Sequence, residues 1–196
     1  MRFEVPLSIT PIKDTIDLGD SLLLEANFPD SLLDIKSGKF FKLPNFDFKI
    51  RIAILKLGNI NLSLAQQPGA SSSFHFINET GAVDDLSETF GGLKFEYING
   101  IYKAKVLVIP KQIGVFALTF FSRLSGHNNE LDFIDLGRTE SGGRKIANLT
   151  NVYFLVNDSQ TNYELLKQNS KLGSIVSPNT ENIRDEKNGT YTFAVK

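Results

Sequence analysis

The chain has 196 residues, of which 41% are hydrophobic and 22% charged, so its composition excludes a disordered chain and is typical of a folded globular protein. Its formal net charge of −1 leaves no excess of basic residues to neutralise phosphates, so we expect no nucleic-acid partner. The absence of cysteine excludes disulfides, thiolate zinc sites and a cysteine nucleophile, and the apolar runs are too short to span a bilayer, so we expect no membrane-spanning segment.

Alternating apolar and polar residues predict short strands through the first half of the chain. A turn at Gly19-Asp20 leads into 22–28, where every second residue is apolar and one face would be buried. Residues 46–57 alternate most strongly and predict a strand that is buried on one face and exposed on the other. Further strands are expected over 3–12, 60–64, 74–77, 93–98, 101–109 and 115–121.

Two local signals between these strands are more specific. Asn99-Gly100 separates two alternating runs, and this pair predicts a hairpin because a type I′ turn needs positive φ at both central residues. Asp85 and Glu88 have the spacing of a helix cap, and Gly91-Gly92 follows them, so one helical turn is expected over 84–90.

The alternation loosens beyond residue 125, which favours a sandwich over 1–125 and a C-terminal extension over 126–196 that packs on it. A capping box at Thr161 predicts a short helix over residues 161–168. A final strand over 190–195 must return to pair with an earlier strand, because a lone strand could not bury its apolar face. Together the elements predict an all-β fold, namely an antiparallel immunoglobulin-like β-sandwich with a short C-terminal helix and a returning strand.

Three aspartates recur at every third residue near the first predicted turn: Asp14, Asp17 and Asp20. Carboxylates at this spacing could form a calcium site together with backbone carbonyls. The alternative is that they are turn residues whose side chains accept hydrogen bonds from backbone N–H groups. Their spacing differs from that of an EF-hand loop, which favours the turn.

Two consecutive aromatic residues, Phe40 and Phe41, follow a Ser37-Gly38-Lys39 turn and precede Leu43-Pro44. Aromatic side chains in such a turn-rich stretch could face solvent and form a stacking platform for a sugar or a docking patch. The alternative is that they cap one end of the sandwich. They are the candidate binding residues of the sequence.

Catalytic patterns are weak in this chain. The two histidines, His75 and His127, lie far apart in the sequence without an acidic pattern beside them, so neither a zinc site nor a catalytic triad is indicated. The glycine pairs at 91–92 and 142–143 lack the lysine and the Ser/Thr of a phosphate loop and favour loops. We therefore expect no catalytic residue and no cofactor.

Three stretches resemble uncharacterised exported or lipid-anchored β-sandwich proteins of Bacteroidota. Residues 14–22 are similar to their D-x-I-x-x-G-D-[ST]-L opening strand, and 114–118 to their G-x-[YF]-x-L strand. The third stretch runs from 152–154 through 162–166 to 189–195. In those proteins an asparagine-tyrosine helix, here 162–166, precedes a closing G-x-Y-x-F-x-V strand, here 189–195.

The resemblance implies export through a leader that ends in a lipid-bearing cysteine. The protein would then lie in the cell envelope, periplasmic or extracellular, with a lipid anchor in its precursor. Proteins of that phylum can carry O-glycans at Asp-[Ser/Thr]-apolar sites, and the matching positions here are Thr15, Ser21 and Ser31. The resemblance carries over no catalytic residue.

We expect from these observations a non-enzymatic cell-surface or periplasmic binding or adhesion module. Its ligand would be a glycan, a peptide or an envelope protein. The alternatives are a structural accessory subunit of an envelope assembly and a carbohydrate-active enzyme. A binding module predicts a concave or aromatic-lined surface, a structural subunit predicts a large apolar patch, and an enzyme predicts converging acidic or histidine side chains in a deep pocket.

Overall fold

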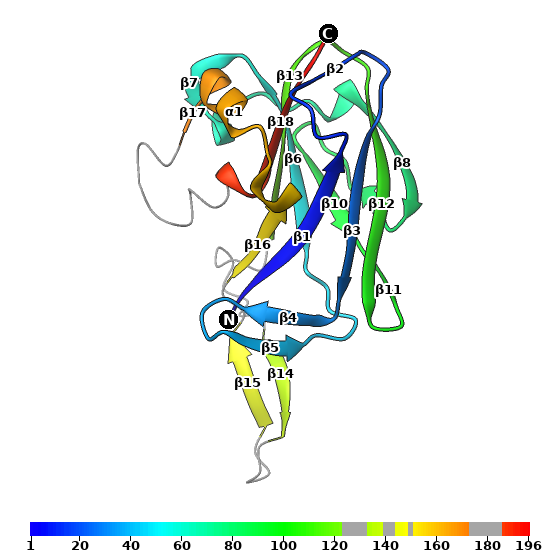
Figure 1. Cartoon of the computed structure of the whole chain (residues 1–196), viewed down its shortest axis with the longest axis vertical. Helices are drawn as coiled ribbons and strands as arrows, with labels where there is room; N and C mark the ends of the chain where they lie inside the picture. Colours follow the sequence, from blue (N-terminus) through cyan, green and yellow to red (C-terminus); the bar gives the residue numbers. More distant parts are fainter. Residues whose placement is uncertain (123–132, 139–143, 149–150, 173–185) are drawn as a thin grey trace.

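Two β-sheets packed against each other form the body of the protein (Figure 1), and one large hydrophobic core, to which both sheets contribute, lies between them. The computed structural model describes residues 1–122, 133–138, 144–148, 151–172 and 186–196. Most neighbouring strands are antiparallel. The protein is an all-β sandwich, as the sequence predicted.

Within the described ranges, the first sheet has eight strands and the second has six. Across the first sheet the order is β11 (Glu96–Ile98), β12 (Ile101–Pro110), β3 (Leu22–Pro29), β1 (Arg2–Thr10), β4 (Ser31–Asp34) and β5 (Lys39–Lys42); β8 (Phe74–Thr80) also pairs with β12, and β16 (Asn151–Val156) with β1. Across the second sheet the order is β2 (Thr15–Ile16), β18 (Thr190–Val195), β13 (Gly114–Ser122), β6 (Ile50–Leu57), β10 (Phe90–Lys94) and β9 (Ala82–Asp84).

The remaining elements are small. Two further strand pairs are β14 (Phe133–Arg138) with β15 (Arg144–Asn148), and β7 (Asn59–Ser63) with β17 (Ser170–Lys171). The α-helix is α1 (Tyr163–Asn169), and the 3-10 turns are η1 (Leu64–Gln66), η2 (Ser71–Ser73) and η3 (Asn157–Ser159). No helix in the described part of the chain is long and apolar enough to cross a membrane.

The alternation predicted for 22–28 is confirmed in β3. Leu22, Leu24, Ala26 and Phe28 are all buried in the main core, and each large apolar side chain contributes about 1.5–3 kcal/mol by leaving water. The Asn99-Gly100 hairpin is confirmed as well, because these two residues have φ of 52° and 80° and join β11 to β12.

Strand β6 is buried on both faces, whereas the sequence predicted burial on one. Ile50, Ile52 and Ile54 face the main core, while Ala53, Leu55 and Leu57 belong to a second cluster. Leu166 of α1 is fully buried in that second cluster, so the helix covers the outer face of the sheet at this point. The alternation identified one buried face, and the cover on the other face comes from a helix more than a hundred residues later in the sequence.

The helical turn expected over 84–90 was a wrong prediction. Asp84 ends β9, and Asp85 has a left-handed φ of 47° that no right-handed helix accommodates. The Ser87 and Phe90 backbone groups then hydrogen-bond to each other, with a donor–acceptor distance of 2.7 Å from Ser87 N to Phe90 O. The segment is the connection between two strands that pair, β9 and β10.

Strands from the C-terminal part of the chain enter both sheets. β16 lies parallel to β1, and β18 lies between β13 and β2. The returning strand is confirmed, and Tyr191, Phe193 and Val195 point into the main core. The expected boundary at residue 125 lies outside the described residues.

The short helix is confirmed, with a different cap. α1 begins after Asn162, which has a left-handed φ of 57° and no side-chain capping hydrogen bond. The Thr161 hydroxyl donates to the Lys187 carbonyl at 2.6 Å instead. The predicted capping residue therefore ties the helix start to the segment before β18.

Candidate functional site

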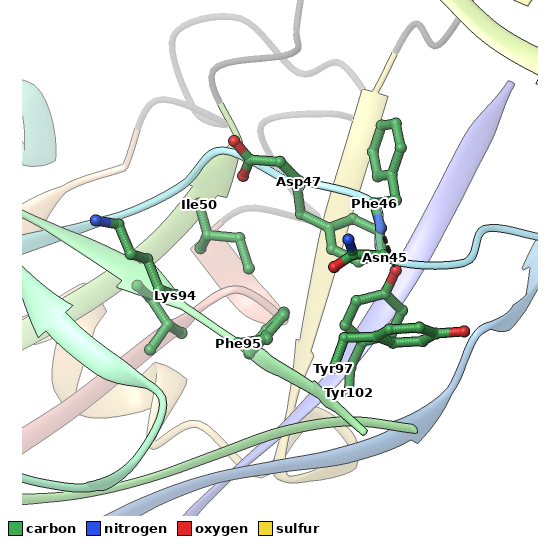
Figure 2. A pocket seen from close by; sticks show the side chains of 10 residues that line it. Asn45, Phe46, Asp47, Ile50, Lys94, Phe95, Tyr97 and Tyr102 are labelled. Carbon is green, nitrogen blue, oxygen red and sulfur yellow. Dashed lines mark hydrogen bonds between the residues drawn. The ribbon is translucent and has the colours of Figure 1, made fainter. Parts of the chain in front are cut away.

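The strongest candidate site is an open groove of about 240 Å³ beside the segment that joins β5 to β6 (Figure 2). We call it the aromatic groove. Lys94 lies at one end of the view, and Tyr97 and Tyr102 lie at the other. Its lining residues come from that segment, from the start of β6 and from the neighbourhood of β10, β11 and β12: Asn45, Phe46, Asp47, Phe48, Ile50, Leu93, Lys94, Phe95, Tyr97 and Tyr102.

The rings of the groove stand on a packed aromatic base. Tyr102 on β12 lies directly opposite Phe28 on β3 in the strand register, and their rings stack with centroids 5.2 Å apart. Phe48 meets Tyr102 edge-to-face at 5.1 Å, and Phe46 meets Phe48 edge-to-face at 5.1 Å. Each such ring pair adds about 0.5–1.5 kcal/mol beyond the burial of area. The groove is therefore floored by aromatic rings that pack against one another.

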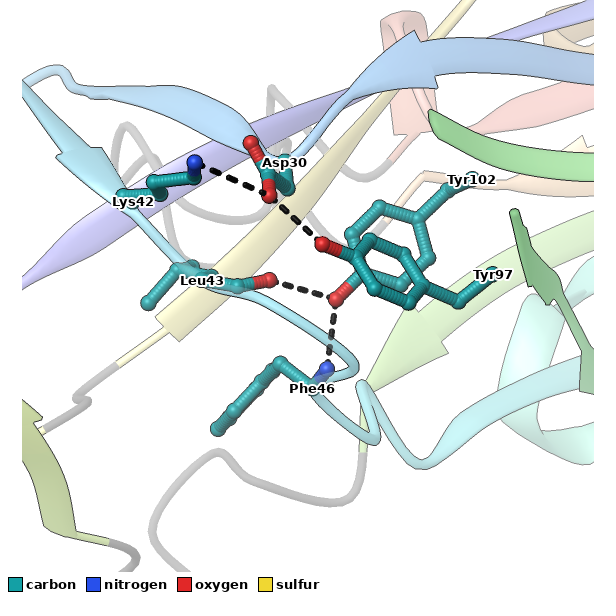
Figure 3. Close-up of polar contacts among 6 residues, drawn as sticks. All are labelled: Asp30, Lys42, Leu43, Phe46, Tyr97 and Tyr102. Carbon is teal, nitrogen blue, oxygen red and sulfur yellow. Dashed lines mark hydrogen bonds and ion pairs between the residues drawn. The ribbon is translucent and has the colours of Figure 1, made fainter. Parts of the chain in front are cut away.

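The hydroxyl of Tyr102 fixes the segment that carries Phe46 (Figure 3). It donates a hydrogen bond of 2.5 Å to the Leu43 carbonyl and accepts one of 2.5 Å from the Phe46 N–H. Asn45 and Lys49 have left-handed φ of 49° and 45°, which bends the segment on both sides of Phe46. The backbone at the rim of the groove is thus held by a buried side chain.

A second tyrosine closes the same end of the groove. The Tyr97 hydroxyl donates a 2.7 Å hydrogen bond to Asp30 Oδ2, and Asp30 is only 6% exposed (Figure 3). Lys42 Nζ lies 3.9 Å from the same oxygen. The hydrogen bond to the carboxylate, followed by desolvation, raises the pKa of Tyr97 to about 12. The Tyr97 ring lies beside that of Tyr102, with centroids 4.9 Å apart.

The groove continues into a charged part. An adjoining cavity of about 240 Å³ shares Asp47, Ile50, Leu93 and Lys94 with the aromatic groove. It adds Lys49, Arg51, Asp84, Asp85 and Gly92 to the lining. The two cavities thus lie side by side, the first lined mainly by aromatic rings and the second mainly by charged side chains.

Gly92 and an ion pair shape the charged part. Lys94 Nζ lies 2.6 Å from Asp84 Oδ2, and the hydrogen bond to Asp84 raises the pKa of Lys94. A Cβ on Gly92 would lie 2.9 Å from Asp84 Oδ1, so the Asp84 carboxylate would have to shift to make room for it. Gly91 and Gly92 belong to β10, so the prediction that this pair lies in a loop was wrong.

The structure separates the two phenylalanines predicted as binding residues. Phe40 is 69% exposed on β5. Phe41 points the other way, is half-buried, and meets Phe3 of the core edge-to-face at 6.3 Å. Of the two phenylalanines, only Phe40 has the predicted exposed side chain, and neither Phe40 nor Phe41 lines the aromatic groove.

Two of the three predicted aspartates, Asp17 and Asp20, hydrogen-bond to each other within the first turn. The Asp17 N–H donates to Asp20 Oδ2 at 3.2 Å, and the Asp20 N–H donates to the Asp17 carbonyl at 3.0 Å. The Asp14 carbonyl accepts from the Ala194 N–H. Among the described residues, no group of three or more His, Cys, Asp and Glu side chains is placed to hold a metal ion. These contacts support the turn interpretation rather than a calcium site.

The remaining predicted positions are spread over the surface. Ser21 is exposed, whereas Thr15 on β2 and Ser31 on β4 are half-exposed, and O-glycosylation at the three stays a prediction. His75 is exposed on β8. His127 lies outside the described residues.

Sequence reasoning missed the aromatic groove. Tyr97 and Tyr102 lie in runs predicted as strands, and Tyr102 is a buried core residue, so neither pointed to a groove. Phe46 was predicted as part of a strand that in fact begins at Ile50. The Pro44-Asn45 pair is a turn signal that could have ended the strand earlier and left Phe46 in a loop. No protein-family model matches the chain, and no curated protein matches it either.

Proposed function

We propose that the protein is a non-enzymatic binding module that holds a short stretch of glycan in the aromatic groove. The observation that carries the proposal is the juxtaposition of the Phe46 and Tyr97 rings with the Asn45, Asp47 and Lys94 side chains around one open depression. The apolar faces of sugar rings pack on aromatic rings, and sugar hydroxyls pair with amides, carboxylates and ammonium groups. A few polar groups around an apolar floor are typical of sites for small ligands.

The charged part of the depression supports binding rather than hydrolysis. A glycosidase uses one carboxyl group held protonated by apolar surroundings and a second, ionised one. Here Asp84 is paired with Lys94, and Asp47 is exposed and accepts the Lys49 N–H at 2.9 Å. Carboxylates in these surroundings serve as hydrogen-bond acceptors for a ligand.

The rigidity of the groove supports the same proposal. The Phe46 backbone is held by Tyr102 and the Tyr97 ring by Asp30, so little conformational entropy is lost when a ligand binds. The location that goes with this function is the cell envelope, on the strength of the resemblance at 14–22 and 189–195. The alternative, a structural accessory subunit, would need a large apolar patch on the surface.

A glycan array tests the proposal, with a peptide array run in parallel on the same protein. The proposal expects saturable binding to a group of related glycans and none to peptides. Asp47→Asn should weaken the strongest interaction about fivefold, because a charge-assisted hydrogen bond becomes a neutral one. Lys111→Gln, at an exposed position between β12 and β13, is the control and should change nothing. Peptide binding without glycan binding would overturn the ligand class.

A further inference from the structure

The hairpin formed by β4 and β5 carries an apolar pair on its outward face. Leu33 and Phe40 lie directly opposite each other in the strand register and are 39% and 69% exposed. Leu32 and Phe41, also opposite each other, point to the core. The hairpin runs crosswise to β1 and β3 (Figure 1), and the exposure of Leu33 and Phe40 places the apolar pair on the face turned away from the core.

The basic side chains of the hairpin are exposed, whereas the acidic side chains are buried. Lys36, Lys39 and Lys42 are exposed around the apolar pair. The acids described in and beside the hairpin are internal: Asp30 accepts from Tyr97 and lies 3.9 Å from Lys42 Nζ, and Asp34 is 3% exposed. Solvent therefore meets a surface of one phenylalanine, one leucine and three lysines.

The tip of the hairpin is held in one conformation. The Ser37 hydroxyl donates to Asp34 Oδ2 at 2.7 Å, and the Gly38 N–H donates to the Asp34 carbonyl at 2.8 Å. Gly38 has a left-handed φ of 69°, which a glycine accepts without strain. The exposure of Phe40 is therefore a fixed feature of the fold, and no rearrangement is needed to present it.

We propose that the β4–β5 hairpin binds the surface of an anionic phospholipid bilayer. Apolar side chains enter the boundary between headgroups and acyl chains, and flanking lysines interact with anionic headgroups. A second copy of the chain is a poorer occupant, because pairing two β5 edges would bring Lys39 and Lys42 toward their own copies, and edge lysines oppose such pairing. The inference is independent of the aromatic groove and goes beyond glycan binding.

Vesicle sedimentation tests this inference. The full chain is mixed with vesicles of phosphatidylcholine alone or with three parts in ten of phosphatidylglycerol. We expect binding to the anionic vesicles, and binding that falls as salt rises. Phe40→Ala should weaken it about tenfold, by removing one apolar anchor. Lys36→Gln with Lys39→Gln should weaken it about 25-fold, since each lysine near an anionic surface contributes about fivefold.

Matched controls keep the result specific. Ile113→Ala removes an apolar side chain that is 62% exposed between β12 and β13, and Lys111→Gln removes a lysine there, so both should bind as the wild type does. Equal binding to neutral vesicles, no binding to either vesicle, or equal loss in the controls would overturn the proposal. A concentration-dependent dimer in size-exclusion chromatography that Phe40→Ala abolishes would also overturn it, because the occupant would then be a second copy.

Discussion

The hydroxyl of Tyr97 donates a 2.7 Å hydrogen bond to Asp30 Oδ2, and this contact joins two sequence-distant segments at one end of the sandwich. Asp30 immediately follows β3, and Tyr97 lies on β11. A buried carboxylate is stable only where partners compensate its charge, and here Tyr97 donates a hydrogen bond and Lys42 forms an ion pair at 3.9 Å. The same contact places the Tyr97 ring at the wall of the aromatic groove.

Alkaline unfolding tests this contact. The folded pKa of Tyr97 is about 12, above the unfolded value of about 10. The stabilisation is therefore fully present below pH 10 and is lost as pH rises toward 12. The free energy of unfolding in urea should fall more steeply over this window for the wild type than for Tyr97→Phe. Parallel curves for the two proteins would show that the contact does not govern the ionisation of Tyr97.

Acid unfolding tests the hydrogen bonds that the Asp34 carboxylate accepts at the tip of the β4–β5 hairpin. Burial alone would raise the pKa of Asp34, but hydrogen bonds from the Ser37 hydroxyl and from the Arg2 and Lys36 N–H groups outweigh it, so the pKa is lowered. A lowered folded pKa gives stability that is present above the unfolded value of about 3.9 and is lost as pH falls through the folded value. Asp34→Asn should remove this part of the acid dependence, measured as the difference in unfolding free energy between the two proteins from pH 6 downwards. A constant difference across that range would contradict the assignment.

Leu166→Ala tests the cover that α1 gives to β6. The side chain is fully buried in the second cluster, so its truncation should cost about 2–5 kcal/mol. Leu18→Ala is the matched control at an exposed position and should change stability by less than about 0.5 kcal/mol. Urea denaturation measures both, and equal effects of the two substitutions would show that α1 does not pack as described.

Tyr102→Phe separates the aromatic base from the backbone that it holds. The ring remains, while the Leu43 carbonyl and the Phe46 N–H lose their partner, at a cost of about 1–3 kcal/mol. Because Phe46 is then less firmly held, glycan affinity should also fall. If a folded Tyr102→Phe protein kept the wild-type glycan affinity, the hydrogen bonds of the Tyr102 hydroxyl to Leu43 and Phe46 would not be needed for binding.

The fold could be predicted because apolar and polar residues alternate along strands such as β3, a pattern that is visible in the local sequence. The Asn99-Gly100 pair likewise predicts its turn from two adjacent residues. The burial of the outer face of β6 could not be predicted, because it depends on α1, which is distant in the sequence. The aromatic groove escaped prediction for a similar reason. Tyr97 and Tyr102 look like ordinary strand residues, and their role follows from the segment around Phe46, whose path depends on the Tyr102 hydroxyl.

Calorimetric titration of the strongest array glycan tests the central claim most directly, with three proteins compared: wild type, Phe46→Ala and Phe40→Ala. Phe46 lines the aromatic groove, whereas Phe40 is an exposed phenylalanine outside its lining. We predict that Phe46→Ala weakens binding about tenfold or more, as expected for an aromatic anchor, and that Phe40→Ala binds as the wild type does. Undiminished binding by a folded Phe46→Ala protein, or an equal loss in both variants, would contradict the assignment of the groove.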